Sequence, residues 1–154
     1  DAPTVNANAG PRLPDRWLKA ETNPGETVGN VIGSTDPTAL ITDQDAGALK
    51  GFAVIDAANL NGTWEYSTDG GTTWGSLAGV SVSNARLLDE TAKLRFVPFK
   101  KKFSGEVSLT VVAWDQTVGT NGGTVNASVR GGATTFSDDS VQVTQSVVKK
   151  MPSV

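Results

Sequence analysis

The fold is decided by the stretch Trp64-Glu-Tyr-Ser-Thr-Asp-Gly-Gly-Thr-Thr-Trp74, in which two aromatic-containing arms are joined by an Asp69-Gly70-Gly71 corner. A tight turn between strands requires positive φ, which glycine adopts without steric cost, so Asp-Gly is a strong hairpin signal. The flanking aromatic and threonine side chains favour half-buried positions on a pleated sheet. The stretch therefore predicts a β-hairpin.

Inside this hairpin the residues follow the spacing S-x-D-x-G-x-T-W, from Ser67 to Trp74. The spacing resembles the Asp-box of sialidases and other β-propellers, where it forms a structural turn. Short Asp and Ser side chains hydrogen-bond the loop backbone in such turns. A single copy predicts a hairpin and not a propeller. The structural role is expected for Ser67, Asp69, Gly71 and Trp74.

The rest of the composition is typical of an all-β protein. The chain has 154 residues with 17 glycines, one methionine and one tyrosine, and no long segment repeats apolar residues at helical spacing. This length suits one domain. We expect a β-sandwich of about seven to nine strands with essentially no helix. The expected layout is a linker at 1–16, the sandwich at 17–148 and a tail at 149–154.

Alternation of apolar and polar residues, bounded by Gly, Pro and Asn, predicts the individual strands. The segment Glu106–Trp114 is rich in β-branched residues and is expected at the centre of a sheet. The other strands expected outside the hairpin are Trp17–Glu21, Thr27–Ile32, Gly51–Ile55, Ala85–Leu88, Lys93–Val97 and Ser140–Val147.

The absence of cysteine and histidine restricts the available chemistry. It removes disulfides, thiolate catalysis, most transition-metal ligation and the usual general base. Carboxylates remain, but they are poorly convergent in the sequence, so we expect no enzymatic activity. The net charge of −3 argues against nucleic-acid binding, and no apolar run has the length of a membrane span. Because the chain starts at Asp1, we expect a processed or excised piece of a larger protein.

Three carboxylates are candidates for binding a hard cation. Asp43 and Asp45 lie in one predicted loop, and Asp115 follows the central strand. Loop carboxylates spaced i, i+2 can direct oxygens at one Ca²⁺, which takes about six to eight oxygen ligands. The same spacing is also common in solvated turns and helix caps. A calcium site is the stronger hypothesis if the fold brings Asp1 and Asp115 to the same loop.

Several segments in this order resemble the cadherin-like tandem repeats of very large bacterial surface proteins and RTX-type adhesins. The resemblance extends from about Glu21 to Thr144. It is carried by Ile41-Thr-Asp-Gln-Asp-Ala-Gly-Ala, Gly51-Phe-Ala-Val, Asn61-Gly-Thr-Trp-Glu-Tyr-Ser-Thr-Asp-Gly-Gly-Thr-Thr-Trp, Ala85-Arg-Leu-Leu, Leu94-Arg-Phe-Val-Pro and Ala113-Trp-Asp-Gln-Thr-Val-Gly.

The resemblance implies an Ig/cadherin-like, calcium-binding β-sandwich on the bacterial cell surface, with calcium at the junctions between neighbouring modules of one polypeptide. It places Asp43, Asp45 and Asp115 at the edge facing the preceding module and Asp1 in the linker. Glu21 matches an acidic position of the family, although the next acid is replaced by Thr22. The implied function is that of a non-catalytic spacer or adhesion module, stiffened by calcium.

Two features leave another function open. The sequence Pro98-Phe-Lys-Lys-Lys-Phe-Ser-Gly105 departs from the acidic or neutral loop of the family, and its lysines form either a solvated loop tip or a contact with an acidic partner. The tryptophans either pack in the core or form a flat platform that binds carbohydrate or peptide. The four tryptophans are Trp17, Trp64, Trp74 and Trp114.

Overall fold

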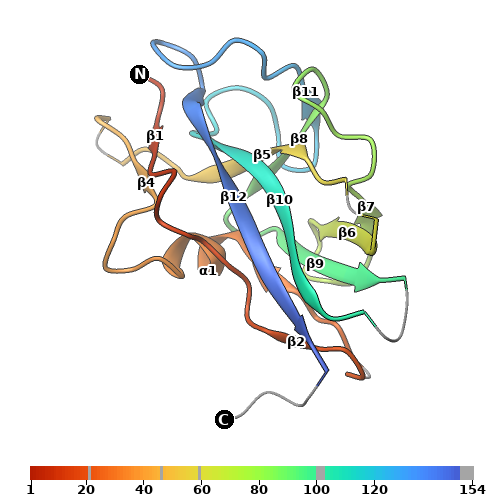
Figure 1. Cartoon of the computed structure of the whole chain (residues 1–154). Helices are drawn as coiled ribbons and strands as arrows, with labels where there is room; N and C mark the ends of the chain where they lie inside the picture. The colour runs from red at the N-terminus through yellow and green to blue at the C-terminus, as the bar shows by residue number, and fades with distance from the viewer. Residues whose placement is uncertain (21, 46, 59, 100–102, 150–154) are drawn as a thin grey trace.

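The computed structural model describes residues 1–20, 22–45, 47–58, 60–99 and 103–149. Strands dominate these residues and form two large sheets and one small one (Figure 1). The six-stranded sheet has the order β11-β8-β5-β10-β12-β2. Its strands are β11 (Thr124–Val125), β8 (Ala85–Asp89), β5 (Gly51–Asp56), β10 (Gly105–Trp114), β12 (Phe136–Val148) and β2 (Arg16–Trp17).

The four-stranded sheet has the order β3-β9-β6-β7, and a separate pair joins β1 to β4. All pairings are antiparallel except the one between β12 and β2. The strands are β3 (Glu26–Thr27), β9 (Lys93–Pro98), β6 (Gly62–Ser67), β7 (Gly75–Ser76), β1 (Thr4–Val5) and β4 (Ile41–Thr42). The chain is therefore all-β, as its composition predicts.

One core lies between the two large sheets. Trp64 on β6 and Phe96 on β9 are fully buried and meet edge to face, with ring centroids 5.4 Å apart. They share a cluster with residues of β10, including Leu109 and Val111. The Trp64 indole N–H donates to the Ser108 carbonyl oxygen at 3.1 Å, which satisfies the buried donor across the two sheets.

A second apolar cluster covers the other face of the six-stranded sheet. It contains Ile55, Leu87, Val112 and Trp114 together with Phe136. The centre of this sheet is therefore buried on both faces. This explains why β5 and the end of β10 are continuous apolar runs and not alternating ones.

The prediction of a strand at Thr27–Ile32 is wrong, because most of this segment lies in the helix α1 (Val28–Gly33). The Thr27 hydroxyl caps the helix by accepting the N–H of Asn30 at 3.1 Å. Val28 and Val31 lie three residues apart and are both fully buried. Helical spacing therefore directs both valines into the core, although β-branched residues favour strands in isolation.

The other strand predictions differ mainly at their ends. β5, β8, β9 and β10 lie within one residue of the expected bounds, whereas β12 begins four residues earlier, at Phe136. The strand expected at Trp17–Glu21 is the shorter β2, and Glu21 lies outside the described residues. The described chain contains more strands than the seven to nine expected, because six of them are two-residue pairings.

The first sixteen residues, expected as a linker, pack on the same body. Val5 and Leu13 are buried in the main core. Leu13 donates its N–H to the carbonyl of Thr144 at 2.9 Å, and Asn6 donates to Leu40 at 2.8 Å. This packing carries Asp1 to the end of the molecule where β10 finishes (Figure 1). Within the described chain, no helix has the length and apolarity needed to cross a membrane.

Candidate metal site

A bulge at the end of β10 positions Asp115. The register between β10 and β12 shifts between Val112 and Trp114, so the N–H of Ala113 lacks a ladder partner. The buried Ser137 hydroxyl accepts that N–H at 2.8 Å. Asp115 then donates its own N–H to the Thr135 carbonyl at 3.0 Å. The strand therefore ends with Asp115 buried, only 6% of the residue being exposed.

One oxygen of the Asp115 carboxylate, Oδ1, is held by two threonines. It accepts the backbone N–H of Thr117 at 3.0 Å, the Thr117 hydroxyl at 2.7 Å and the Thr135 hydroxyl. Burial alone raises the pKa of Asp115, but these hydrogen bonds and the N-terminal ammonium outweigh burial and lower it. Asp115 is therefore a fixed, ionised carboxylate.

The residue after Asp115 ties its loop to β5. Gln116 has a φ of 66°, which is uncommon for a residue other than glycine. Its side-chain amide donates to the Lys50 carbonyl at 3.0 Å, just before β5 begins. This contact joins the end of β10 to the segment that follows Asp43 and Asp45.

Asp43 and Asp45 form a small turn after β4. The Asp45 N–H donates to Asp43 Oδ1 at 2.9 Å. The second oxygen, Asp43 Oδ2, is buried and has no hydrogen-bond partner among the residues that the structure describes. A buried carboxylate oxygen needs a donor or a cation, so Asp43 Oδ2 is a candidate ligand atom.

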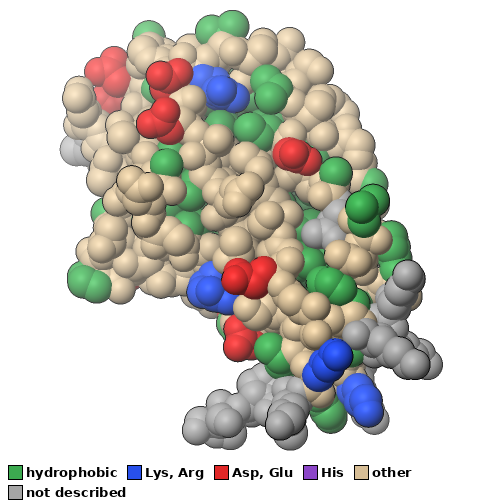
Figure 2. Space-filling model, viewed as in Figure 1, with side chains coloured by type: hydrophobic (Ala, Val, Ile, Leu, Met, Phe, Trp, Pro, Cys, Tyr) green, Lys and Arg blue, Asp and Glu red, His purple; other side chains and the backbone are tan. Residues whose placement is uncertain are grey.

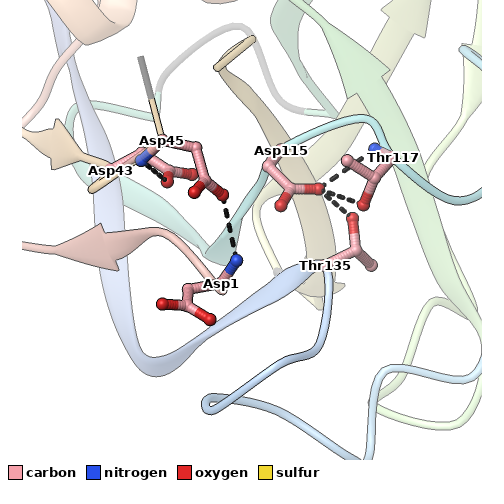
Figure 3. A network of polar contacts seen from close by, with 6 residues as sticks. All are labelled: Asp1, Asp43, Asp45, Asp115, Thr117 and Thr135. Carbon is pink, nitrogen blue, oxygen red and sulfur yellow. Dashed lines mark hydrogen bonds and ion pairs between the residues drawn. The ribbon is translucent and has the colours of Figure 1, made fainter. Parts of the chain in front are cut away.

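The N-terminal ammonium of Asp1 lies beside these carboxylates. It forms an ion pair with Asp45 Oδ2 at 2.9 Å. The hydrogen bond to Asp45 and the charges of Asp45, Asp43 and Asp115 raise the pKa of this amino group above its ordinary value. Figure 3 draws the carboxylates of Asp45 and Asp115 above the Asp1 amino group, which a dashed line joins to Asp45 alone. The charges of all three carboxylates therefore act on this amino group, but only Asp45 pairs with it.

The structure therefore brings Asp1, Asp43, Asp45 and Asp115 to one edge, as the sequence suggested. In the described parts of the chain, however, no three acidic side chains are close enough together to hold a metal ion as they stand. Thr117 and Thr135, which hold Asp115, were not anticipated. The Asp115-x-Thr117 spacing is a recognisable turn signal, but nothing in the sequence links Thr135 to Asp115.

The Asp69 turn is a polar network, as expected for an Asp-box. Ser67 Oγ donates to Asp69 Oδ1 at 2.7 Å and accepts the Gly71 N–H at 2.9 Å. Asp69 also accepts the Thr73 N–H at 2.9 Å and the Thr73 hydroxyl, and the Trp74 indole donates to the Gly71 carbonyl. The turn is wider than a tight hairpin, because Tyr66 pairs with Gly75 across it. The network replaces the ladder hydrogen bonds that this loop lacks.

We expect the Asp69 turn to weaken in acid. The hydrogen bonds from Thr73 and Ser67 lower the Asp69 pKa from 3.8 to about 2. A lowered folded-state pKa gives stability that is complete above about pH 4 and is lost as the pH falls through about 2. Asp69→Asn should lower the melting temperature by roughly 2–4 °C at pH 5, and this difference should shrink at pH 2. Thermal melts at both pH values, with the exposed Asp139→Asn as control, check this; an undiminished difference at pH 2 contradicts it.

The tryptophans are poorly placed for a flat binding platform. Trp64 and Trp114 are buried, and the Trp114 indole donates to the Val118 carbonyl at 2.8 Å. Trp74 is half-buried, and the Arg95 guanidinium lies 4.0 Å from its ring centroid. Trp17 is half-buried on β2, at the edge of the six-stranded sheet. The geometry therefore favours the carboxylate edge over a tryptophan-lined site.

Comparisons with protein-family models, with curated proteins and with solved structures gave no match for this chain.

Proposed function

We propose that this chain is a non-catalytic, Ig/cadherin-like module of an extracellular bacterial adhesin, and that calcium at the Asp43–Asp45–Asp115 edge stiffens it. The observation that supports this proposal most is that the Asp43–Asp45 turn and Asp115, at the end of β10, lie at one edge beside Asp1, where their charges act on the same group. Carboxylates gathered at one edge provide the negative charge and the oxygen ligands that a calcium site uses.

The ligand chemistry also suits calcium. All candidate donors are carboxylate oxygens, which hard cations prefer. Within the described parts of the chain, Asp43 Oδ2 is buried and has no hydrogen-bond partner, and Asp115 uses Oδ1 for the hydrogen bonds from Thr117 and Thr135. The other Asp115 oxygen takes part in none of these hydrogen bonds (Figure 3). In our proposal, calcium takes the place of the ammonium and draws the Asp43–Asp45 turn toward Asp115.

The proposed mechanism is mechanical. Asp1 lies at the start of the chain, Asp45 between β4 and β5, and Asp115 at the end of β10. One ion bound to all three would join segments that are far apart in sequence and would fix the direction in which the chain enters the module. Oxygens from a neighbouring module of the same polypeptide would complete the coordination shell, and cell-surface carbohydrate or protein would be the target of the assembled adhesin.

Adding residues before Asp1 tests whether its amino group competes with calcium for Asp45. A Gly-Ser extension before Asp1 turns its amino group into a neutral amide, which removes the positive charge beside Asp45. Calorimetric titration should show tighter calcium binding to the extended chain than to the parent, by roughly tenfold for about 1.4 kcal/mol of relieved competition. Magnesium should bind more weakly, because it demands smaller and more regular coordination.

In the extended chain, Asp115→Asn removes the charge of one proposed calcium ligand. Asp139→Asn removes the same charge at an exposed position of β12 and serves as the control. Binding should fall in the first variant and stay unchanged in the second. Absence of calcium binding by the extended chain, or an equal loss in both variants, contradicts the proposed site.

A further inference from the structure

Two tripeptides of the chain have the Asn-x-Ser/Thr pattern of acceptors for N-glycosylation, Asn61-Gly-Thr63 and Asn126-Ala-Ser128. The pattern is short and recurs by chance, so the fold has to decide whether a copy is a site. A transferase needs an asparagine amide on the surface and a backbone that is not held in a sheet. The structure separates the two tripeptides on this criterion.

The second tripeptide forms a turn directly after β11. Ala127 is fully buried in the second apolar cluster, and its N–H donates to the Val82 carbonyl at 2.8 Å. Asn126 and Ser128, on either side of this buried residue, are both exposed. Burial of the middle residue therefore presents the two side chains of the pattern to solvent.

The hydrogen bonds of this turn leave the acceptor atoms free. Asn126 Oδ1 accepts the N–H of Ser128 at 2.9 Å. Asn126 Nδ2 is the atom that receives a sugar, and Ser128 Oγ is the hydroxyl that the pattern requires. Neither atom has a hydrogen-bond partner within the part of the chain that the structure describes. Both are therefore available to an enzyme.

The first tripeptide is held in the four-stranded sheet. Gly62 is buried, and Thr63 is half-buried and pairs with Val97 across β6 and β9. The Asn61 carbonyl accepts the Phe99 N–H at 2.9 Å. An enzyme would have to open the pairing of β6 with β9 to reach this tripeptide. We therefore expect it to stay unmodified in the folded chain.

The exposed tripeptide lies away from the carboxylate edge. β11 is the outermost strand of the six-stranded sheet, and β8 and β5 separate it from β10, which ends next to Asp115. Three strand spacings amount to about 14 Å. Figure 2 shows acidic side chains in red at the upper left, near the N-terminus, whereas β11 lies to the right in the same view (Figure 1). A sugar beside β11 therefore leaves the carboxylate edge open.

We propose that Asn126 is an N-glycosylation site. The substrate is a sugar activated by a phosphate group on its anomeric carbon, and a transferase of the producing cell catalyses the step. The bond from the anomeric carbon to Asn126 Nδ2 forms and the bond from that carbon to the phosphate oxygen breaks. The amide proton passes to a base of the enzyme, and the phosphate leaves with its carrier. Val82 and Val129, 38% and 72% exposed, adjoin the turn, so the sugar also covers apolar surface.

Peptide mass spectrometry of the protein from the cells that naturally produce it tests this proposal. Cleavage after lysine and arginine places the two tripeptides on different peptides, 51–86 and 103–130. Peptide 103–130 should carry a sugar, and peptide 51–86 should not. The mass of the attached group identifies the donor: nucleotide-linked sugars are added one at a time, whereas a lipid carrier delivers a preassembled oligosaccharide.

Two substitutions of Ser128 provide the variant and its matched control. Ser128→Ala keeps Asn126 exposed but removes the hydroxyl, so the sugar should be lost, whereas Ser128→Thr preserves the pattern and should keep it. Ser128 is exposed, so both variants should keep the melting temperature of the parent. An unmodified peptide 103–130 in the parent, a sugar that survives Ser128→Ala, or equal modification of both peptides overturns the proposal. None of these results depends on calcium binding.

Discussion

Trp64→Ala is expected to lower the free energy of unfolding by about 3–5 kcal/mol, a large part of the stability of a domain of this size. Trp64 is fully buried between the two large sheets, where it meets Phe96 edge to face at 5.4 Å. Alanine leaves a cavity between the two sheets, and the Ser108 carbonyl also loses the hydrogen bond that the indole N–H donates. Urea denaturation followed by circular dichroism measures the loss.

Two variants separate the causes of that loss. Trp64→Phe keeps most of the apolar volume but removes the indole N–H, so it should cost less than Trp64→Ala. Trp74→Ala removes a half-buried tryptophan that stacks on Arg95, and it should also cost less. If Trp64→Ala costs no more than Trp74→Ala, Trp64 is not the centre of the shared core.

Strands with strong local patterns were predictable from the sequence. β5, β8, β9 and β10 are bounded by turn residues and contain β-branched or aromatic side chains, and their bounds agree within a residue. The helix α1 was not predicted, because Val28, Val31 and Ile32 favour a strand by propensity. The Thr27 cap and the core contacts of the valines outweigh that preference.

The two-residue strands were not predictable for a different reason. β2 pairs with the end of β12, and β1 pairs with β4, so their partners lie far away in the sequence. A two-residue pairing carries no periodic pattern of its own. The first sixteen residues were therefore expected to be a linker, although Val5 and Leu13 enter the core.

The candidate site was partly predictable. Spacing indicated the Asp43–Asp45 turn, and the end of a predicted strand indicated Asp115. Their convergence with Asp1 depends on the packing of the N-terminal segment, which local sequence does not show. The contacts of Thr135 and Ser137 depend on the bulge between β10 and β12, which only the register reveals.

The second large expected effect is stabilisation by calcium. A ligand that binds only the folded chain stabilises it by about 2.7 kcal/mol at one hundred times its dissociation constant. For a chain of this length, that raises the melting temperature by roughly 5–10 °C. Asp43→Asn/Asp45→Asn should remove most of this rise, because it replaces two of the proposed calcium ligands, including Asp43 Oδ2, which has no hydrogen-bond partner among the described residues.

The control for Asp43→Asn/Asp45→Asn is a second double variant with the same change in net charge. Asp138→Asn/Asp139→Asn also removes two carboxylates, at exposed positions of β12, and should keep the calcium response. Without calcium, Asp43→Asn/Asp45→Asn loses the ion pair with the Asp1 ammonium, an exposed pair that contributes little to stability. The difference between the two double variants therefore reports calcium binding.

The most direct measurement is the melting temperature of the Gly-Ser-extended chain in millimolar calcium and in chelator, for the parent sequence and for both double variants. We expect a rise of roughly 5–10 °C in calcium for the parent sequence and for Asp138→Asn/Asp139→Asn, and almost no rise for Asp43→Asn/Asp45→Asn. The same melting temperature in calcium and in chelator for the parent sequence would contradict the calcium-stiffened module.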